Sequence, residues 1–146
     1  MTVLRHLVAI AAFSLLAACQ PTSTVSGNPD TRVLNSGLTT FAQDLALAGF
    51  LADRCRPFGV RRRVSDFAAT RAYFEVLAEQ GYSQSQINAA AQTLSTPQSV
   101  RRSSAQVIAY LESRGLRPGD PPAKLCGVAI DEIDRNTQTG RFLRKV

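Results

Sequence analysis

The sequence predicts an all-α domain, a small bundle of about five short helices with one disulfide, after a flexible N-terminal tether. Apolar residues recur every three or four positions along most of the chain, as on amphipathic helices. No segment shows the sustained alternation of apolar and polar residues that is typical of strands. The 146 residues, 45% hydrophobic and 19% charged, fit one globular domain.

Residues 1–18 have the layout of an export signal. Arg5 and His6 precede an uncharged apolar run over residues 7–18, which ends in small residues. A helix that crosses a bilayer needs about 20 apolar residues, so this run is too short to span a membrane and is typical of a signal peptide. We therefore expect export followed by cleavage after Ala18.

The residues around the expected cleavage point indicate lipidation. Leu16-Ala17-Ala18-Cys19 resembles the lipobox of bacterial lipoproteins. The resemblance implies that the Cys19 thiol receives a diacylglycerol, and two or three acyl chains give durable anchoring. It also implies a membrane-anchored protein facing the periplasm, and Gln20 after the cysteine favours the outer membrane. The alternative is an ordinary secretory signal followed by a coincidental cysteine.

Export decides how the two remaining cysteines are interpreted. Cys55 and Cys126 form an even pair in an oxidising compartment, which favours one disulfide. The bridge would close a loop of about 70 residues. By restricting the unfolded chain, it would raise the free energy of unfolding by roughly 4 kcal/mol. A metal site needs more donors, and the only histidine, His6, belongs to the expected signal peptide. Neither a metal nor a cofactor is expected.

The boundaries of the domain follow from composition. Residues 19–37 are rich in turn formers and predict the lipidated cysteine with a flexible linker, which leaves 38–146 as the helical domain, with Val33 and Leu34 as an alternative start of the packed region. The apolar spacing predicts a first helix over residues 38–55. Pro57 and Gly59 cannot continue this helix, so it is expected to end there.

Four further helices are expected from capping signals and apolar stripes. The caps are Ser65 for the second helix, the Ser83–Gln86 capping box for the third, Thr96 before Pro97 for the fourth and Asp120 for the fifth. The residues expected to face inward include Phe67, Thr70, Phe74 and Leu77 on the second helix, and Val100, Ser104, Val107, Ile108 and Leu111 on the fourth.

A series of short motifs resembles a known family. The series runs Gly81-Tyr82-Ser83, Ala109-Tyr110-Leu111, Gly115-Leu116-Arg117-Pro118-Gly119-Asp120, Leu125-Cys126-Gly127, Asp131-Glu132-Ile133 and Gly140-Arg141-Phe142-Leu143. It is similar to an uncharacterised family of small exported helical proteins from Rhodobacter-like alphaproteobacteria, over roughly residues 38–144. The resemblance implies an accessory role and assigns no catalytic or binding residue. The lipobox is a departure, because the family carries ordinary secretory signals.

Catalytic motifs are missing from the sequence, so we expect no enzymatic activity. Once the signal peptide is removed, no histidine remains to act as the base for a serine nucleophile. The carboxylates that could be nominated for hydrolysis are Glu75, Glu79, Asp131, Glu132 and Asp134. Glu75 and Glu79 stand four residues apart on one helix, where acidic residues ordinarily form a solvated face.

The conspicuous surface feature of the sequence is basic. Arginines gather around Cys55, at Arg54, Arg56, Arg61, Arg62 and Arg63. Their planar guanidinium groups suit anionic partners such as lipid headgroups, lipopolysaccharide phosphates or an acidic protein face. The alternative is a solvated linker whose arginines pair with nearby acids. Nucleic acid is not expected outside the cytoplasm, despite a pI of 9.9.

Two classes of function stay open. The favoured one is a lipid-anchored interaction module, an accessory or scaffold subunit of an envelope complex, and the alternative is an envelope hydrolase or a carrier of a small ligand or lipid. A carrier needs an apolar cavity and an enzyme needs convergent ionisable groups in a cleft, whereas a module needs neither. The C-terminal tail, with Phe142, Leu143 and Val146, either docks a partner or closes the core.

Overall fold

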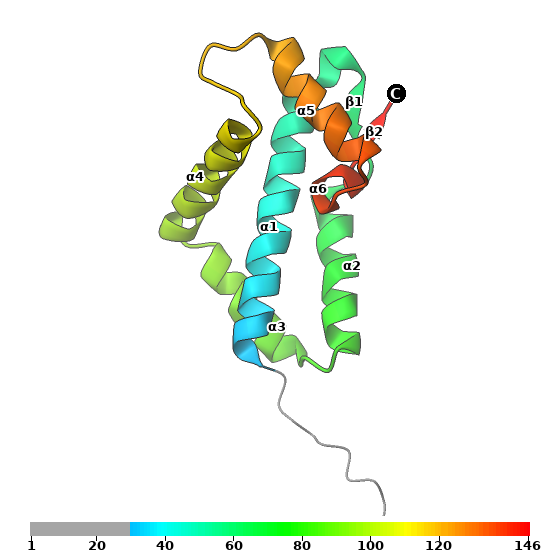
Figure 1. Cartoon of the computed structure of the whole chain (residues 1–146). Coiled ribbons are helices and arrows are strands. Elements are labelled where there is room, and N and C mark those ends of the chain that lie inside the picture. Colours follow the sequence, from blue (N-terminus) through cyan, green and yellow to red (C-terminus); the bar gives the residue numbers. More distant parts are fainter. Residues whose placement is uncertain (1–29) are drawn as a thin grey trace, which may run out of the picture.

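The computed structural model describes residues 30–146 (Figure 1). The expected signal peptide and Cys19 lie outside the described residues. The elements in chain order are α1 (Thr31–Arg54), the 3-10 turn η1 (Arg56–Phe58), β1 (Val60–Arg62), α2 (Asp66–Glu79), α3 (Gln84–Leu94), α4 (Pro97–Ser113), α5 (Pro122–Asp134), α6 (Gln138–Arg141) and β2 (Leu143–Lys145). The predicted helical bundle is confirmed, with a sixth short helix and one pair of three-residue strands in addition.

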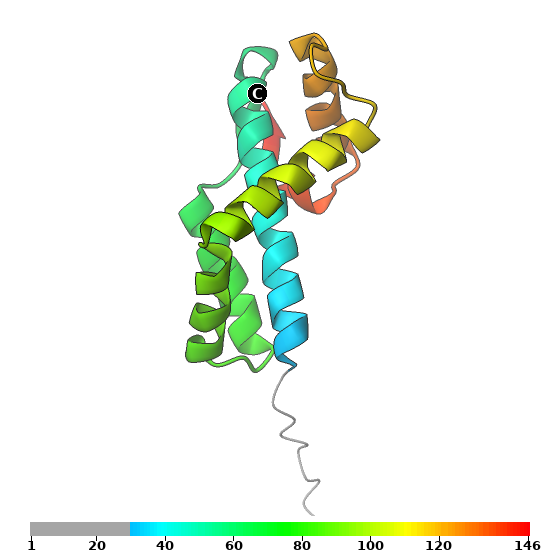
Figure 2. The same ribbon diagram turned by 90° about the vertical axis from the view of Figure 1, so that its left-hand side faces the viewer.

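Helix α1 is the axis of the domain, and α3, α4, α5 and α6 all contact it. Figures 1 and 2 show α2 and α3 beside its lower half and α5 beside its upper end. A helix of 24 residues rises about 36 Å, so α1 extends through most of the domain. Within residues 30–146 no helix is both long enough and apolar enough to cross a bilayer.

The first helix begins at Thr31, earlier than predicted. The Asp30 side chain caps its first turn, and Leu34 is buried one turn later. The predicted linker over 19–37 was therefore too long at its end. The turn-forming character of Gly37 was misleading, because capping by Asp30 and burial of Leu34 stabilise the helix through that glycine.

Three of the four predicted caps are confirmed, at Ser65, Ser83 and Thr96. The prediction for Asp120 was wrong, because Pro121 stands between it and the first residue of α5, and no side chain of the described structure caps that helix. The Asp120 carboxylate turns back instead. It accepts hydrogen bonds from the backbone N–H of Arg117 at 2.7 Å and from Nζ of Lys124 at 2.8 Å.

The buried side chains form two clusters along α1. The larger one surrounds the disulfide and consists of Phe41, Leu47, Ala48, Leu51, Ala52, Cys55, Val60, Ala69, Cys126, Ala129, Phe142 and Leu143. The smaller one lies toward the N-terminal end of α1 and consists of Leu34, Leu38, Leu77, Tyr82, Ile87 and Ala90. Phe142 and Leu143 are buried in the larger cluster, which supports the expectation that the tail closes the core.

Two helices face the core with only part of the predicted stripe: Leu77 and Phe74 of α2 and Val107 and Leu111 of α4 pack inward as predicted. On α2, Phe67 is 79% exposed and Ala69 is buried instead. None of the residues of α4, all of which the structure describes, is fully buried, and Val100 and Ile108 are 54% and 57% exposed. The weak burial of α4 follows from its orientation. In Figure 2, α4 crosses α1 at an angle and covers only part of α1.

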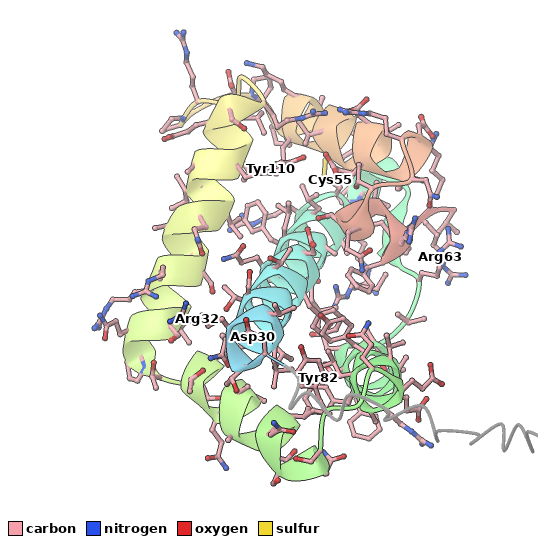
Figure 3. The ribbon with its side chains drawn as sticks, turned by 60° about the horizontal axis from the view of Figure 1, so that its bottom comes forward. Asp30, Arg32, Cys55, Arg63, Tyr82 and Tyr110 are labelled. Carbon is pink, nitrogen blue, oxygen red and sulfur yellow. A yellow bond between two sulfur atoms is a disulfide. The ribbon has the colours of Figure 1, made fainter. Side chains whose placement is uncertain are left out.

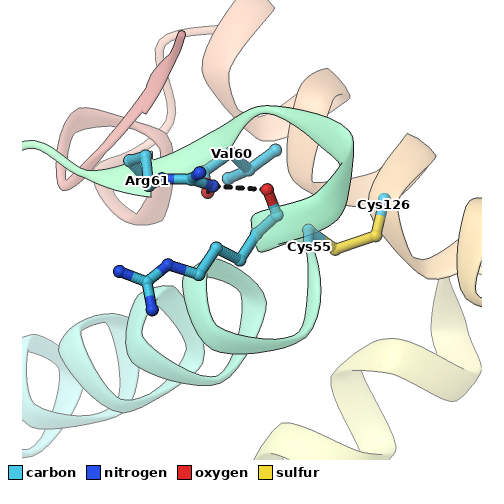
Figure 4. The surroundings of a disulfide bond; sticks show 5 residues. Cys55, Val60, Arg61 and Cys126 are labelled. Atoms are coloured by element: carbon cyan, nitrogen blue, oxygen red, sulfur yellow. Dashed lines mark hydrogen bonds between the residues drawn. A yellow bond between two sulfur atoms is a disulfide. The ribbon is translucent and has the colours of Figure 1, made fainter.

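The predicted disulfide between Cys55 and Cys126 is confirmed (Figure 4). It joins the residue that ends α1 to the second turn of α5, across 71 residues of sequence. Both cysteines are buried in the larger cluster. The bond therefore holds the C-terminal end of α1 and the N-terminal half of α5 together from inside the core.

Replacing Cys55 and Cys126 by serine should lower the free energy of unfolding by about 4 kcal/mol, because the unfolded chain regains the freedom of the closed loop. Urea unfolding of the chain from Gln20 onward measures this. The unmodified chain in reducing buffer serves as the control and should unfold like the variant. Equal stability of the oxidised chain and the variant would contradict the prediction.

Gly140→Ala should destabilise the fold by roughly 1–3 kcal/mol, because overpacking forces the backbone to shift. A Cβ at Gly140 would lie 1.9 Å from the carbonyl oxygen of Glu132. Gly127→Ala is the matched control, since a Cβ there meets no atom within 4 Å. The control should be neutral or stabilising in thermal unfolding, and a similar loss in both variants would refute the argument.

Candidate functional site

Part of the arginine-rich segment, Val60–Arg62, is a strand of the fold, while Arg54, Arg56 and Arg63 lie outside it and are exposed. β1 pairs antiparallel with β2, and the register places Arg61 opposite Arg144 and Arg62 opposite Leu143. The pairing extends one residue further, because the backbone N–H of Arg63 donates to the carbonyl of Phe142 at 2.8 Å. Two segments about 80 residues apart in sequence thus lie side by side.

Arg62 and Arg61 are tied to the protein by their guanidinium groups. Nη1 of Arg62 donates to the carbonyl of Leu45 at 3.0 Å, and the same side chain forms an ion pair with Asp66. Burial lowers the pKa of this guanidinium. Arg61 donates to the carbonyls of Arg56 and Val60 beside the disulfide (Figure 4). These contacts fix the positions of both side chains, and for Arg61 they use only Nη1.

The strand pairing also brings further cations to the predicted basic segment. The basic ribbon, as we name it, consists of Arg56, Arg61, Arg63, Arg141 and Arg144. Arg63 lies on the side of the domain away from α4 (Figure 3). Within residues 30–146 no carboxylate forms an ion pair with any of these five side chains. The remaining predicted arginine is Arg54. Its guanidinium carbon, Cζ, lies 5.7 Å from the centre of the Phe50 ring.

Sequence reasoning missed Arg141 and Arg144 as members of this surface. Strands of three residues are too short to show the alternation that identifies a strand. No signal in the sequence therefore indicated that the tail lies beside the arginine-rich segment.

An apolar groove lies between α1 and α4. This α1–α4 groove has a volume of about 440 Å³ and is lined by Ala42, Ala46, Phe50, Leu94, Val100, Ser103, Ser104, Val107, Ile108 and Leu111. A second hollow of about 450 Å³ shares Ala42, Ala46, Phe50 and Leu94 with it and continues toward α2. The two hollows thus adjoin along one face of α1, and the second one also includes the polar side chains of Asp53, Asp66 and Thr70.

A polar pocket of about 280 Å³ lies on the other side of the α1–α4 crossing, against α5 and α6. Glu132 is only 3% exposed, and its carboxylate accepts hydrogen bonds from the hydroxyls of Tyr110 and Thr137. The Thr139 hydroxyl donates to Asp44 at 2.8 Å. We name this site the Asp44–Glu132 pocket.

Burial controls the ionisation of two groups in this pocket. It raises the pKa of Asp44, with a further increase from the charge of Glu132, although the hydrogen bond from Thr139 acts in the opposite direction. Burial and the hydrogen bond to Glu132 raise the pKa of Tyr110 to about 12. Tyr110 therefore remains a protonated donor at neutral pH.

The sequence offered no way to find Asp44 and Tyr110, because the pocket is assembled from four helices. Glu132 was among the nominated carboxylates, but nothing in the sequence showed that it was buried. In the part of the chain that the structure describes, no three His, Cys, Asp or Glu side chains are grouped to hold a metal.

Fold and surface define a small, disulfide-bonded helical domain with a basic ribbon and an apolar groove. The chain belongs to a family of unknown function, DUF5333, whose model matches residues 30–144. The match extends from the cap of α1 into β2, so it includes almost all of the described structure. Comparison with curated proteins and with solved structures found no significant match.

Asp44→Asn should raise stability at neutral pH. The pKa of Asp44 is higher in the folded chain than in the unfolded chain, so its contribution to stability is present below the unfolded pKa and lost as pH rises through the folded pKa. Asparagine cannot ionise and keeps an acceptor for Thr139. Urea unfolding across the acidic range should show the advantage of the variant disappear as the pH falls, and a constant difference would disprove this account.

Proposed function

We propose that this protein is a lipid-anchored, non-catalytic helical module, an accessory or scaffold subunit of a complex in the bacterial envelope. The observation that carries the proposal is the α1–α4 groove, which is apolar and open at the surface. Contiguous apolar surface of this kind on a folded domain marks sites of interaction. The exposed side chains of Val100 and Ile108 at its edge are apolar groups that a partner would bury.

The shape of the groove suits a helix of a partner protein. Ala42 and Ala46 on its floor are small, so a second backbone can approach α1 closely. Phe50, Val100 and Ile108 supply aromatic and branched side chains at the walls, which are typical contacts of a helix bound in a groove. From residue 100 to 111, α4 rises about 16 Å, which corresponds to three turns of a bound helix.

The anchoring part of the proposal rests on the lipobox at Cys19 and places the domain at the periplasmic side of a membrane, with Gln20 favouring the outer one. The segment from Cys19 to Asp30 reaches roughly 36–40 Å when fully extended. A domain tethered in this way would meet partners that lie in or close to the same membrane.

The Asp44–Glu132 pocket favours the alternative, an envelope hydrolase or small-ligand carrier. It contains convergent ionisable groups, which is the feature expected of an enzyme. The hydrogen bonds to Glu132 and Asp44 from neighbouring side chains support a structural role instead, since they connect α4, α5, α6 and α1. We therefore rank this function second.

Replacing Cys19 by serine should release the protein from membranes, because the thiol that receives the diacylglycerol is removed. Cell fractionation followed by mass spectrometry of the detergent-extracted protein measures this. The unmodified protein should carry acyl groups on Cys19 and an oxidised Cys55–Cys126 pair. An unmodified Cys19, or cleavage at another residue, would overturn the lipoprotein assignment.

Replacing Val100 and Ile108 together by serine should reduce cross-linking to an envelope partner at least tenfold, as expected when two apolar side chains that the partner would bury are removed. Stability should change little, since both side chains are more than half exposed. Phe67→Ser is the control, because it removes an exposed apolar side chain that lies outside the groove. If the unmodified chain, the double variant and Phe67→Ser all cross-link to the partner equally, the groove is not the binding site.

A further inference from the structure

Two distant parts of the chain form one junction beyond the end of α1. The backbone N–H of Val146 donates to the carbonyl of Gly59 at 2.8 Å. Gly59 has a positive φ of 78°, and a Cβ there would lie 2.9 Å from the carbonyl oxygen of Val146, so the close approach requires glycine. Phe58 precedes this junction, and Phe58 and Val146 are 47% and 78% exposed.

Arginines flank the two apolar residues along the chain and across the strand pair. Arg56 stands two residues before Phe58, and Arg61 lies opposite Arg144 in the strand pair. Like charges directly opposite each other destabilise a strand pair. No carboxylate of the described chain offsets this repulsion by an ion pair, so the fold concentrates positive charge here.

The base of this surface is rigid. Cys55, which immediately precedes Arg56, is bonded to Cys126. Val60 and Leu143 of the two strands are completely buried. The exposed groups are therefore held on a preformed backbone, so binding through them requires no ordering of the main chain.

We propose that this surface, the tip formed by Phe58, Val146, Arg56, Arg61 and Arg144, docks on a bilayer that carries anionic phosphate headgroups. Arginine binds phosphate oxygens through paired hydrogen bonds. An aromatic and an aliphatic side chain amid basic residues is the composition of segments that rest in a membrane interface. A free phosphate would engage the arginines alone and leave Phe58 and Val146 in water.

The tip lies at the opposite end of α1 from Asp30, where the expected tether joins the domain (Figure 1). The proposal does not depend on the lipidation of Cys19, because the arginines and apolar groups bind a bilayer by themselves. It goes beyond the proposed function, whose partner lies in the groove.

Vesicle co-sedimentation of the chain from Gln20 onward tests the tip without the lipid anchor. This chain contains all of residues 30–146, which form the described fold. We expect binding to vesicles of phosphatidylcholine mixed with phosphatidylglycerol, weakening as salt increases, and little binding to phosphatidylcholine alone. No binding to the anionic vesicles would overturn the proposal, whether or not the native protein is lipidated.

The Arg56→Ser/Arg144→Ser pair should weaken this binding about 30-fold, from roughly 1 kcal/mol per arginine near an anionic surface. Arg101→Ser/Arg102→Ser removes the same charge from α4 and should bind nearly as the unmodified chain does. Equal losses in the two pairs would show an effect of net charge alone and exclude a site at the tip.

Phe58→Ser separates the bilayer from other anions. It should weaken vesicle binding about tenfold through lost apolar burial, whereas Phe67→Ser on α2 should not. If Phe58→Ser binds vesicles as well as the unmodified chain does, or if inorganic phosphate abolishes vesicle binding, the arginines bind a free anion. Either result would overturn the bilayer site. If the chain does not bind vesicles but captures an acidic protein, the bilayer site is also overturned.

Discussion

The bond between Cys55 and Cys126 is the constraint on which the arrangement of the domain depends. It fixes the last turn of α1 against α5, and the chain segments on either side of it, β1 and the residues after α5, then pair with each other. Each strand of that pair has three residues, too few to be stable in water alone. The covalent link and the buried side chains of Val60 and Leu143 compensate for this weakness.

Local chemistry made much of the fold predictable. Ser65, Ser83 and Thr96 each cap the helix that they precede, because a cap depends only on residues two or three positions away. The disulfide was predictable from the even number of cysteines. The start of α1 was not, since Gly37 and its neighbours resemble a turn until the burial of Leu34 is known.

The surfaces were less predictable, because each depends on contacts between distant segments. The arginines around Cys55 were evident in the sequence. The position of Arg61 opposite Arg144 was not, because strands of three residues show no recognisable pattern from which the register could be predicted. The Asp44–Glu132 pocket requires the relative placement of four helices. The α1–α4 groove exists because α4 crosses α1 at an angle, and periodicity alone predicted a stripe that faced inward.

The weak burial of α4 has a dynamic consequence. Proteins open in cooperative units, and the units with few buried apolar contacts open at the lowest free energy. The half-buried Val107, Tyr110 and Leu111 pack α4 against the larger cluster. The hydrogen bond between Tyr110 and Glu132 and the ion pair of Arg114, the C-cap of α4, with Asp131 add polar contacts. The amide hydrogens of α4 should therefore exchange with solvent when α4 detaches locally. Those of α1 should exchange only when the whole domain unfolds. A ligand in the groove would be linked to this opening, and its affinity would depend on how often α4 is in place.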